Sequence, residues 1–311
     1  IDAIARKKSV LAKGQGPALL DIATYRVSGH SPSDASSYRS KEEIQKWMDA
    51  DPLTNYGRQL VEAGIADVDS LKALDASIVA EIVEVLKLSI DLEKSPRLAA
   101  DSEFIGGVMF SNRQLEKLDD RQPETLMPQG ANSRVQQISR KERGPSPDGK
   151  PVSKLKAYNV RDGIFEAIFD RFYKDPTTIA FGEENRDWGG AFAVYRGLTE
   201  ALPYHRLFNS PISEAAIVGV AVGYGLEGGR AIAELMYCDF LGRAGDEVFN
   251  QLAKWQAMSG GILNLPVVLR ISVGAKYGAQ HSQDWSAFIS HVPGLKAVYP
   301  VTPYDAKGMM N

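Results

Sequence analysis

The second half of the chain alternates between helix-like and strand-like segments, and this order constrains the fold more than any other feature of the sequence. The spacing of apolar residues predicts helices over 160–173, 214–226 and 245–258. Short apolar runs predict strands over 177–181, 231–237, 267–273 and 295–299. Strands that alternate with helices pair in parallel through crossover connections, so we expect an α/β fold with a parallel sheet.

Ligands of parallel α/β sheets bind beyond the carboxyl ends of the strands. In this chain those positions hold Glu183 and Glu184, residues 236–240 and the loop before His281. A site in the second half is therefore expected to be built from these loops.

The first half is predicted to be mainly helical. An apolar run over 19–25 predicts a short buried strand, and a polar loop follows over 26–39. Ser40 and Glu43 have the spacing of a capping box. Residues 67–92 repeat apolar side chains at helical spacing with charges between them, which predicts a long amphipathic helix.

A change in composition near residue 121 divides the chain. Residues 121–156 are mainly Pro, Gly, Gln, Ser, Arg and Lys, which is typical of an exposed linker. We therefore predict a domain over 1–120, a linker over 121–156 and a second domain over 157–311.

The overall composition is ordinary for a globular chain, with 44% hydrophobic and 24% charged residues. A net charge of -3 favours neither nucleic acid nor a membrane surface as a partner, and no run of 18 apolar residues could span a bilayer. The single cysteine, Cys238, excludes an intrachain disulfide and favours a reducing compartment. The sequence contains no P-loop, no Gly-x-Gly-x-x-Gly fingerprint and no Cys/His cluster with metal spacing. Neither end carries a start or stop signal, so we expect truncation at both ends.

Glu214 follows a Ser-Pro-Ile-Ser turn and precedes an apolar, glycine-containing helix over 215–223. An acid at a helix N-terminus is stabilised by the helix dipole, so capping is one interpretation. The other is a proton relay to a nitrogen heterocycle, because an apolar setting raises the pKa of a carboxyl group and such groups gather at functional sites. The spacing alone favours neither interpretation.

The chain has four histidines, of which His281 and His30 are the candidates for chemistry. His281 lies in Gly-Ala-Gln-His-Ser-Gln, where glycine permits close backbone approach to a ligand and polar neighbours can fix the imidazole tautomer. His30 lies in a Ser-Gly-His-Ser loop after the first predicted strand. His205 and His291 are predicted to be structural or on the surface.

Taken together, the motifs resemble the thiamine-diphosphate-dependent dehydrogenase (decarboxylating) component of 2-oxo acid dehydrogenase complexes. Residues 17–118 resemble the C-terminal part of its α subunit, with matches at 16–20, 24–26, 29–31, 33–34, 37–40 and 51–52. Residues 157–311 resemble the pyrimidine-binding domain of its β subunit, with matches at 160–162, 182–184, 189–190, 211–214, 258–261, 278–283, 291, 293–296 and 305–308. This order implies an α–β fusion in one chain.

The resemblance implies a transketolase-like, thiamine-diphosphate-binding fold for 157–311, preceded by a helical C-terminal portion of the α-type domain. It implies that Glu214 hydrogen-bonds a nitrogen of the thiamine pyrimidine and so promotes formation of the nucleophilic carbon of the cofactor. His281 and His30 match the two active-site histidines, which steady the intermediate and assist acyl transfer to a lipoyl group.

Three further residues acquire an expected role from the resemblance. Met236 and Phe240 match positions that line the pyrimidine pocket, and Glu183 lies near that pocket. With Glu214, they are the expected cofactor-binding residues of this chain.

The implied reaction is oxidative decarboxylation of a 2-oxo acid, of the pyruvate or branched-chain type. The acyl group passes to a lipoylated acyltransferase. The expected assembly is a homodimer of fused chains or a heterotetramer-like complex, without nucleic acid or membrane. The bacterial cytoplasm is favoured as the location over the mitochondrial matrix.

The sequence departs from the family at the diphosphate side of the site. A Gly-Asp-Gly with a downstream Asn holds Mg²⁺ and the diphosphate in the family, and this sequence lacks it. The Mg²⁺ ligands are therefore expected upstream of residue 1, and the isolated chain is expected to be inactive. Acetoin dehydrogenase, a transketolase-like enzyme and a non-catalytic scaffold are the alternatives, although the Gly-His-Ser at 29–31 argues against a transketolase.

Overall fold

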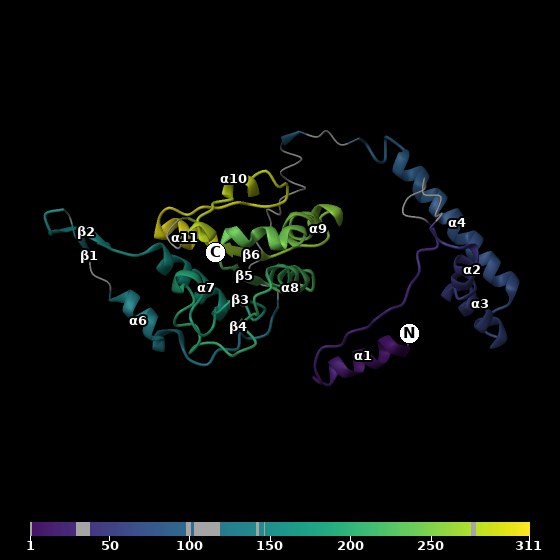
Figure 1. Ribbon diagram of the computed structural model, residues 1–311, viewed down its shortest axis with the longest axis horizontal. Coiled ribbons are helices and arrows are strands. Elements are labelled where there is room, and N and C mark those ends of the chain that lie inside the picture. Colours follow the sequence, from purple (N-terminus) through teal and green to yellow (C-terminus); the bar gives the residue numbers. More distant parts are fainter. Residues whose placement is uncertain are drawn as a thin grey trace. The chain divides into compact units, whose positions relative to one another are not determined.

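The computed structural model describes residues 2–28, 38–97, 101–102, 119–140, 143–145, 147–274 and 278–311. The chain divides into two compact units, over 1–98 and 99–311. Figure 1 labels the elements of both units, which are described here one at a time.

The described part of the first unit is helical. Its helices are α1 (Asp2–Ala12), α2 (Lys41–Asp49), α3 (Pro52–Glu62) and α4 (Val68–Ile90). The predicted cap of α2 is present, since the Ser40 hydroxyl accepts from the Glu43 N–H at 3.0 Å. Asp67 caps α4 in the same way by accepting from the Ser70 N–H at 2.7 Å. Local caps thus define where both helices begin.

The strand predicted over 19–25 is wrong. These residues form no regular element, and Leu19 is 86% exposed. A strand needs a neighbouring strand for its backbone hydrogen bonds, and the described residues of this unit offer only helices. Tyr25 instead stacks on Trp47 of α2, with ring centroids 5.1 Å apart.

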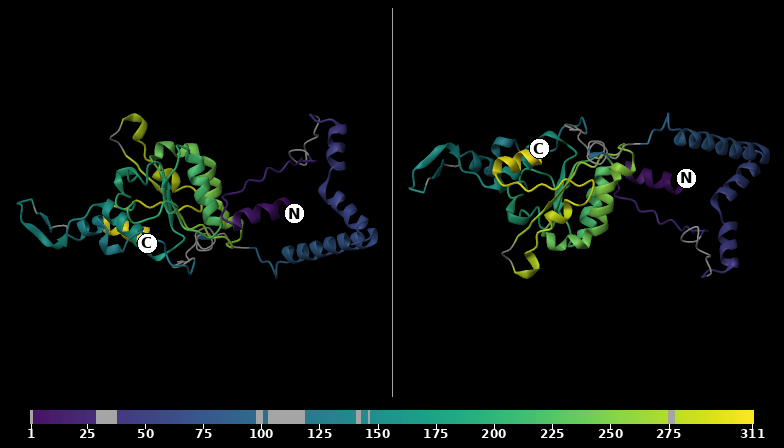
Figure 2. Two further views of the ribbon diagram at one scale, coloured as in Figure 1. Left: turned by 90° about the horizontal axis from the view of Figure 1, so that it is seen from below. Right: turned by 90° about the horizontal axis from the view of Figure 1, so that it is seen from above.

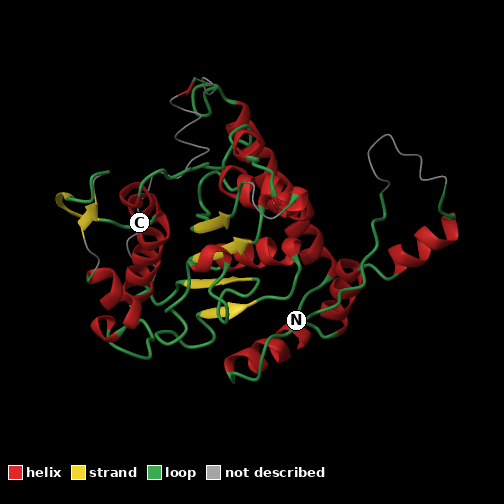
Figure 3. Ribbon diagram, turned by 60° about the vertical axis from the view of Figure 1, so that its left-hand side comes forward, coloured by secondary structure: helices red, strands yellow, loops and turns green. Residues whose placement is uncertain are grey.

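The second unit is built on a parallel sheet with strand order β4-β3-β5-β6. The strands are β3 (Ile179–Gly182), β4 (Leu207–Asn209), β5 (Ala231–Leu235) and β6 (Val267–Ile271). The central strands β3 and β5 are buried along their whole length, which is why they appear in the sequence as unbroken apolar runs. The sheet lies between helices in Figure 3 and confirms the predicted α/β class.

Two cores cover the two faces of this sheet. Successive strand residues point to opposite faces, so Ala180 and Ile232 join one core while Phe181 and Ala233 join the other. Figure 2 shows α7 (Val160–Lys174) and α11 (Pro303–Met310) on one side of the strands, with α8 (Glu214–Leu226) and α9 (Ala253–Met258) on the other.

Helices α7 and α11 approach closely at Gly163. A Cβ atom at this glycine would lie 2.2 Å from the carbonyl oxygen of Pro303, so only glycine permits this packing. Lys307 and Glu166 add an ion pair at 2.9 Å between the same two helices. The last helix of the described chain is thereby fixed to the first long helix of the unit.

Two predicted elements of this unit differ from the structure. The chain is helical over 245–258 as predicted, but residues Glu247–Leu252 are a π-helix before α9, and a 3-10 helix (Cys238–Ala244) precedes them. Residues 295–299, predicted as a strand, form no ladder, and Val298 and Tyr299 are 61% and 58% exposed. They and β6 line a cavity of about 740 Å³, and the expected backbone pairing is absent from this part of the described chain. Short helical turns over 279–281 and 286–289 precede this segment.

The expectation of an exposed linker over 121–156 is wrong for its first part. Helix α6 (Ser133–Ser139) follows a 3-10 turn (Gln129–Ala131), and Asn132 and Arg134 are buried. The Arg134 guanidinium donates to the carbonyl oxygens of Val194 and Arg196 at 2.8 and 2.6 Å. Hydrogen bonds from polar side chains to backbone thus attach this segment to the rest of the second unit, and a count of apolar residues does not detect them. A hairpin of β1 (Arg143–Pro145) and β2 (Pro151–Lys156) follows.

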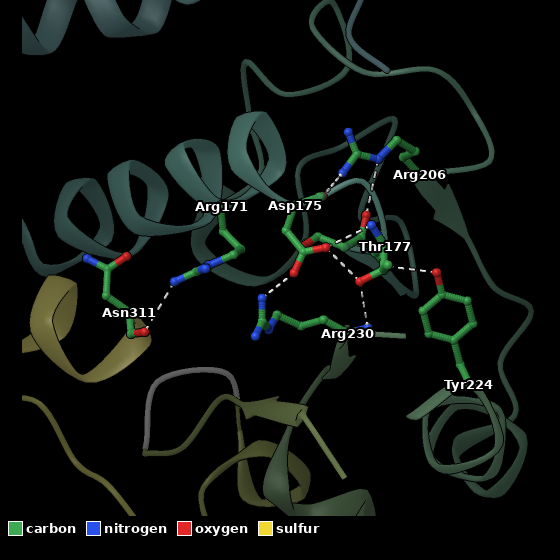
Figure 4. Close-up of polar contacts among 8 residues, drawn as sticks. Arg171, Asp175, Thr177, Arg206, Tyr224, Arg230 and Asn311 are labelled. Carbon is green, nitrogen blue, oxygen red and sulfur yellow. Dashed lines mark hydrogen bonds and ion pairs between the residues drawn. The ribbon is translucent and has the colours of Figure 1, made fainter. Parts of the chain in front are cut away.

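A buried polar network fixes the amino-terminal ends of β3 and β5 (Figure 4). Asp175, which is fully buried, accepts from the N–H and hydroxyl of Thr177 at 2.8 and 2.7 Å and forms an ion pair with Arg230. Arg206 donates to the Asp175 carbonyl oxygen at 2.6 Å, and Tyr224 donates to that of Thr177 at 2.7 Å. Because every member of this network has a partner, we interpret it as structural.

Candidate functional site

Glu183 and Glu214 come together at the carboxyl end of the sheet. Glu183 directly follows β3, and Glu214 is the first residue of α8. The Ser210 N–H donates to the Gly182 carbonyl oxygen at 2.8 Å, which ties the turn before α8 to the end of β3. Two residues that are 31 positions apart in the sequence are thereby placed beside each other.

The two carboxyl groups interact electrostatically. Burial raises the pKa of Glu183, and the negative charge of Glu214 raises it further. Both residues are partly exposed, so a ligand can reach them. Capping of α8 needs one acid at its N-terminus and gives no reason for a second acid that repels the first. The pairing therefore favours the functional interpretation of Glu214 over capping.

A second group of predicted residues surrounds His281. Phe240 and Tyr237 contact the imidazole edge to face, with ring centroids 5.4 and 4.7 Å away. Met236, at the end of β5, is partly buried. The Nδ1 atom of His281 is buried and has no hydrogen-bond partner in the part of the chain that the structure describes. The ring is thus held in this structure by aromatic contacts.

The loop that carries His281 is attached to the residues that follow β5. The Asp239 carboxylate accepts from the N–H groups of Ser282 and Gln283 at 3.2 and 3.4 Å. The Cys238 thiol donates to the Gln283 carbonyl oxygen at 2.7 Å. The segment 237–240 therefore carries Phe240 and also holds the loop that contains His281.

His30, the other predicted active-site histidine, lies outside the described residues. The predicted roles of all these residues remain predictions, because the structure gives their places and contacts but no ligand. His205 is exposed and pairs with Glu124 at 3.2 Å, as expected for a surface histidine.

The sequence analysis missed an ion pair below the site, between Glu234 of β5 and Arg270 of β6. Glu234 is fully buried, and its neighbours Asn185 and Tyr195 are fully buried too. Burial raises the pKa of Tyr195 to about 12, so this phenol stays neutral. A signal was available in the sequence: each of these two apolar strands contains one charged residue, of opposite sign.

The donor groups fit one part of thiamine diphosphate and not the metal that accompanies it. Paired carboxyl groups at the carboxyl end of a parallel sheet suit a pyrimidine ring with basic nitrogens. No group of three or more His, Cys, Asp or Glu side chains in the described ranges could hold a metal ion, so those ranges do not fit a Mg²⁺ site. None of the described helices is long and apolar enough to cross a membrane.

Comparison with known families gives two matches along the chain. Residues 156–311 match the transketolase pyrimidine binding domain, and residues 4–96 match the dehydrogenase E1 component. The first match covers half of the chain, so the chain belongs to the transketolase pyrimidine-binding domain family. Together the two matches confirm the predicted resemblance to a component of the thiamine-diphosphate-dependent 2-oxo acid dehydrogenase class.

Curated relatives match the second half of the chain. The β subunit of acetoin:2,6-dichlorophenolindophenol oxidoreductase from Cupriavidus necator is 43% identical over 164 residues, which are 49% of this chain and 48% of that protein. The human pyruvate dehydrogenase E1 component subunit beta, mitochondrial, is 40% identical over 153 residues, which are 49% of this chain and 43% of that protein. The chain spans somewhat less than half the length of these relatives.

Proposed function

We propose that this chain forms the pyrimidine side of a thiamine-diphosphate site in an enzyme that oxidatively decarboxylates a 2-oxo acid. The observation that supports the proposal is the meeting of Glu183 and Glu214 at the carboxyl end of β3, with the pKa of Glu183 raised. Carboxyl groups brought together against their mutual repulsion are typical of functional sites, and Glu214 is the one of the two that begins an apolar helix.

Each residue of the site has a proposed task. Glu214 hydrogen-bonds a pyrimidine nitrogen, and Glu183 supplies a second carboxyl group at the same edge of the sheet. Met236 and Phe240 line the ring. When bound, thiamine diphosphate supplies a carbon nucleophile and a sink for electrons. His281 and His30 steady the reacting groups and assist acyl transfer to the lipoyl group of an acyltransferase partner.

The substrate and the assembly belong to the same proposal. The 2-oxo acid is pyruvate or a branched-chain relative, and the chain acts as a fused α–β protein, in a homodimer or a heterotetramer-like complex. Its proposed location is the bacterial cytoplasm rather than the mitochondrial matrix. The 311-residue chain by itself is proposed to be inactive, and release of carbon dioxide from a 2-oxo acid by the purified chain would contradict this.

Acetoin oxidation is a second candidate, supported by the 43% identical relative that is named for this reaction. Turnover of acetoin, pyruvate and a branched-chain 2-oxo acid with dichlorophenolindophenol as the electron acceptor separates the two. Faster turnover of acetoin than of either acid favours the second candidate.

The decisive test replaces Glu214 by Gln in the intact protein. Without a carboxyl proton to exchange, the variant is expected to lose activity by about 100-fold or more while its circular dichroism spectrum is kept. Glu227→Gln, at the other end of α8 and exposed, is the matched control and is expected to retain activity. Full activity of Glu214→Gln with any of the three substrates would overturn the proposed relay.

A further inference from the structure

The loop that begins beside Glu183 is held in an unfavourable backbone conformation. Glu184, Phe192 and Ala193 have φ angles of 56°, 57° and 54°, in the left-handed region that side chains other than glycine disfavour. Such conformations persist where surrounding contacts impose them. Three of them within ten residues indicate that something holds this loop in place.

Two neighbouring strands hold the loop at Ala191. The Ala191 N–H donates to the Glu234 carboxylate at 2.6 Å, and the Arg270 guanidinium donates to the Ala191 carbonyl oxygen at 2.8 Å. Glu234 and Arg270 face each other in the register of β5 and β6 and form an ion pair. One residue of the loop is therefore bound on both sides by a single buried pair of charges.

A short chain of hydrogen bonds connects this point to Glu183. The Glu184 carbonyl oxygen accepts from the N–H groups of residues 188–190, at 3.2, 3.1 and 3.0 Å. The last of these directly precedes Ala191. Ala191 and the Glu184 peptide, which directly follows Glu183, are therefore connected through one set of hydrogen bonds.

Gly190 shows how closely the loop approaches the pair. A Cβ atom on this residue would lie 2.7 Å from the Glu234 carboxylate oxygen, and its φ of 66° also favours glycine. Because Gly190 packs this closely, the loop cannot shift toward β5 unless the Glu234 carboxylate also moves.

The cohesion of the sheet does not require these charges. Glu234 is fully buried and the Arg270 side chain is 11% exposed, so both lose hydration on folding. Replacement of a buried ion pair by apolar residues of similar size is often neutral or stabilising. The charges of this pair are therefore weak evidence for stabilisation of β5 and β6, and their hydrogen bonds to Ala191 are the more specific feature.

We propose that Glu234 and Arg270 are positioning residues: they bind both sides of Ala191 and thereby hold Glu183 against Glu214. The inference rests on the proposed function for the importance of Glu183. Neither member of the pair touches a reacting group, and their effect passes through the loop 184–193.

The test compares Glu234→Leu/Arg270→Met with the wild type. In the full chain, hydrogen exchange at the Ala191 amide is expected to be at least about tenfold faster, with thermal stability retained. In the assembled enzyme, kcat is expected to fall by roughly 10- to 100-fold, because Glu183 is displaced from its place beside the cofactor. The KM for the 2-oxo acid is expected to change little, because Glu183 does not bind that substrate. Glu234→Gln keeps an acceptor for Ala191 and is expected to restore slow exchange and most of kcat.

The matched control, Asp175→Asn, removes a buried ion pair with Arg230 at the opposite end of β3. It is expected to destabilise the protein without changing the ratio of the exchange rate at the Ala191 amide to the rates at neighbouring amides. Wild-type exchange at Ala191 or wild-type kcat in the double variant would overturn the inference. If that variant does not fold, Glu234→Ala replaces it, with the same expected exchange. Glu183→Gln tests the underlying function separately: an unchanged kcat there overturns the role of Glu183, whatever the exchange result.

Discussion

Helices α4 and α8 are both apolar over most of their length, and they lie in very different surroundings. Helix α8 buries Ile217, Val218 and Ala221 against β3 and β5. Helix α4 buries none of its residues, and Ile82 and Leu74 are 61% and 57% exposed. The comparison shows that apolar spacing specifies a helix, whereas burial depends on a layer to pack against.

The stability of the two units therefore has different sources. The second unit has two cores, one on each face of its sheet. The described helices of the first unit depend on caps such as Ser40 and Asp67. Substitutions in the two units should accordingly differ in their effect on the free energy of unfolding.

The largest difference is expected between Phe172→Ala and Leu74→Ala. Phe172 is fully buried in one core, so its truncation removes contacts and leaves a cavity, at a cost of about 4 kcal/mol. Leu74 is 57% exposed, and its truncation should change the free energy of unfolding by less than about 0.5 kcal/mol. Urea unfolding followed by circular dichroism measures both. Equal losses would show that α4 is packed in the protein in solution.

The next effect is expected for Asp175→Asn, at about 3 kcal/mol, because it removes the charged carboxylate from a buried ion pair with Arg230. Asp170→Asn is the control in the same unit. Asp170 pairs with Lys174 at 2.7 Å on the surface, where such a pair contributes less than about 1 kcal/mol. Thermal unfolding of the two variants ranks them, and a larger loss for Asp170→Asn would refute the structural role of the network.

A smaller effect is expected for Ser40→Ala, which removes the cap of α2. Loss of a hydroxyl acceptor at an N-cap costs about 1 kcal/mol, and it should appear as faster hydrogen exchange of the Glu43 amide. Ser77→Ala is the control, because the Ser77 hydroxyl only donates back to the Leu74 carbonyl oxygen inside α4. Unchanged exchange at Glu43 would mean that α2 does not depend on its cap.

The smallest effect is expected for Glu183→Gln, and it depends on pH. The folded state raises the pKa of Glu183, so between the ordinary glutamate pKa and the raised value the folded protein binds more protons than the unfolded one. Wild-type stability should therefore fall, relative to the variant, as pH rises through this window. Water screens the partly exposed group and keeps the difference small. Unfolding midpoints at several pH values measure it, with Glu184→Gln as the control, and a difference independent of pH contradicts the shift.

Much of the second unit could be predicted from the sequence, because unbroken apolar runs such as 231–235 are typical of strands buried on both faces. The same reasoning placed Glu183 and the residues after β5 at the carboxyl edge. It could not pair Glu183 with Glu214, since that contact depends on the turn bonded to Gly182. Motif resemblance, rather than spacing, supplied the expected role of Glu214.

The errors share a physical cause. The strand predicted over 19–25 was inferred from local composition, whereas a strand requires a partner elsewhere in the chain. The segment around Arg134 has few apolar residues, yet it is anchored through hydrogen bonds to backbone carbonyl groups. Both cases depend on non-local contacts, which local patterns do not encode.

The packing of α7 against α11 also affects the order of events during synthesis. The Glu166–Lys307 contact joins residues 141 positions apart. At about 5–20 residues per second, a ribosome needs roughly 7–30 s to add the residues between them. For that interval the surface of α7 around Gly163 has emerged without its partner helix. It is a site at which a chaperone can bind the nascent chain before the domain closes.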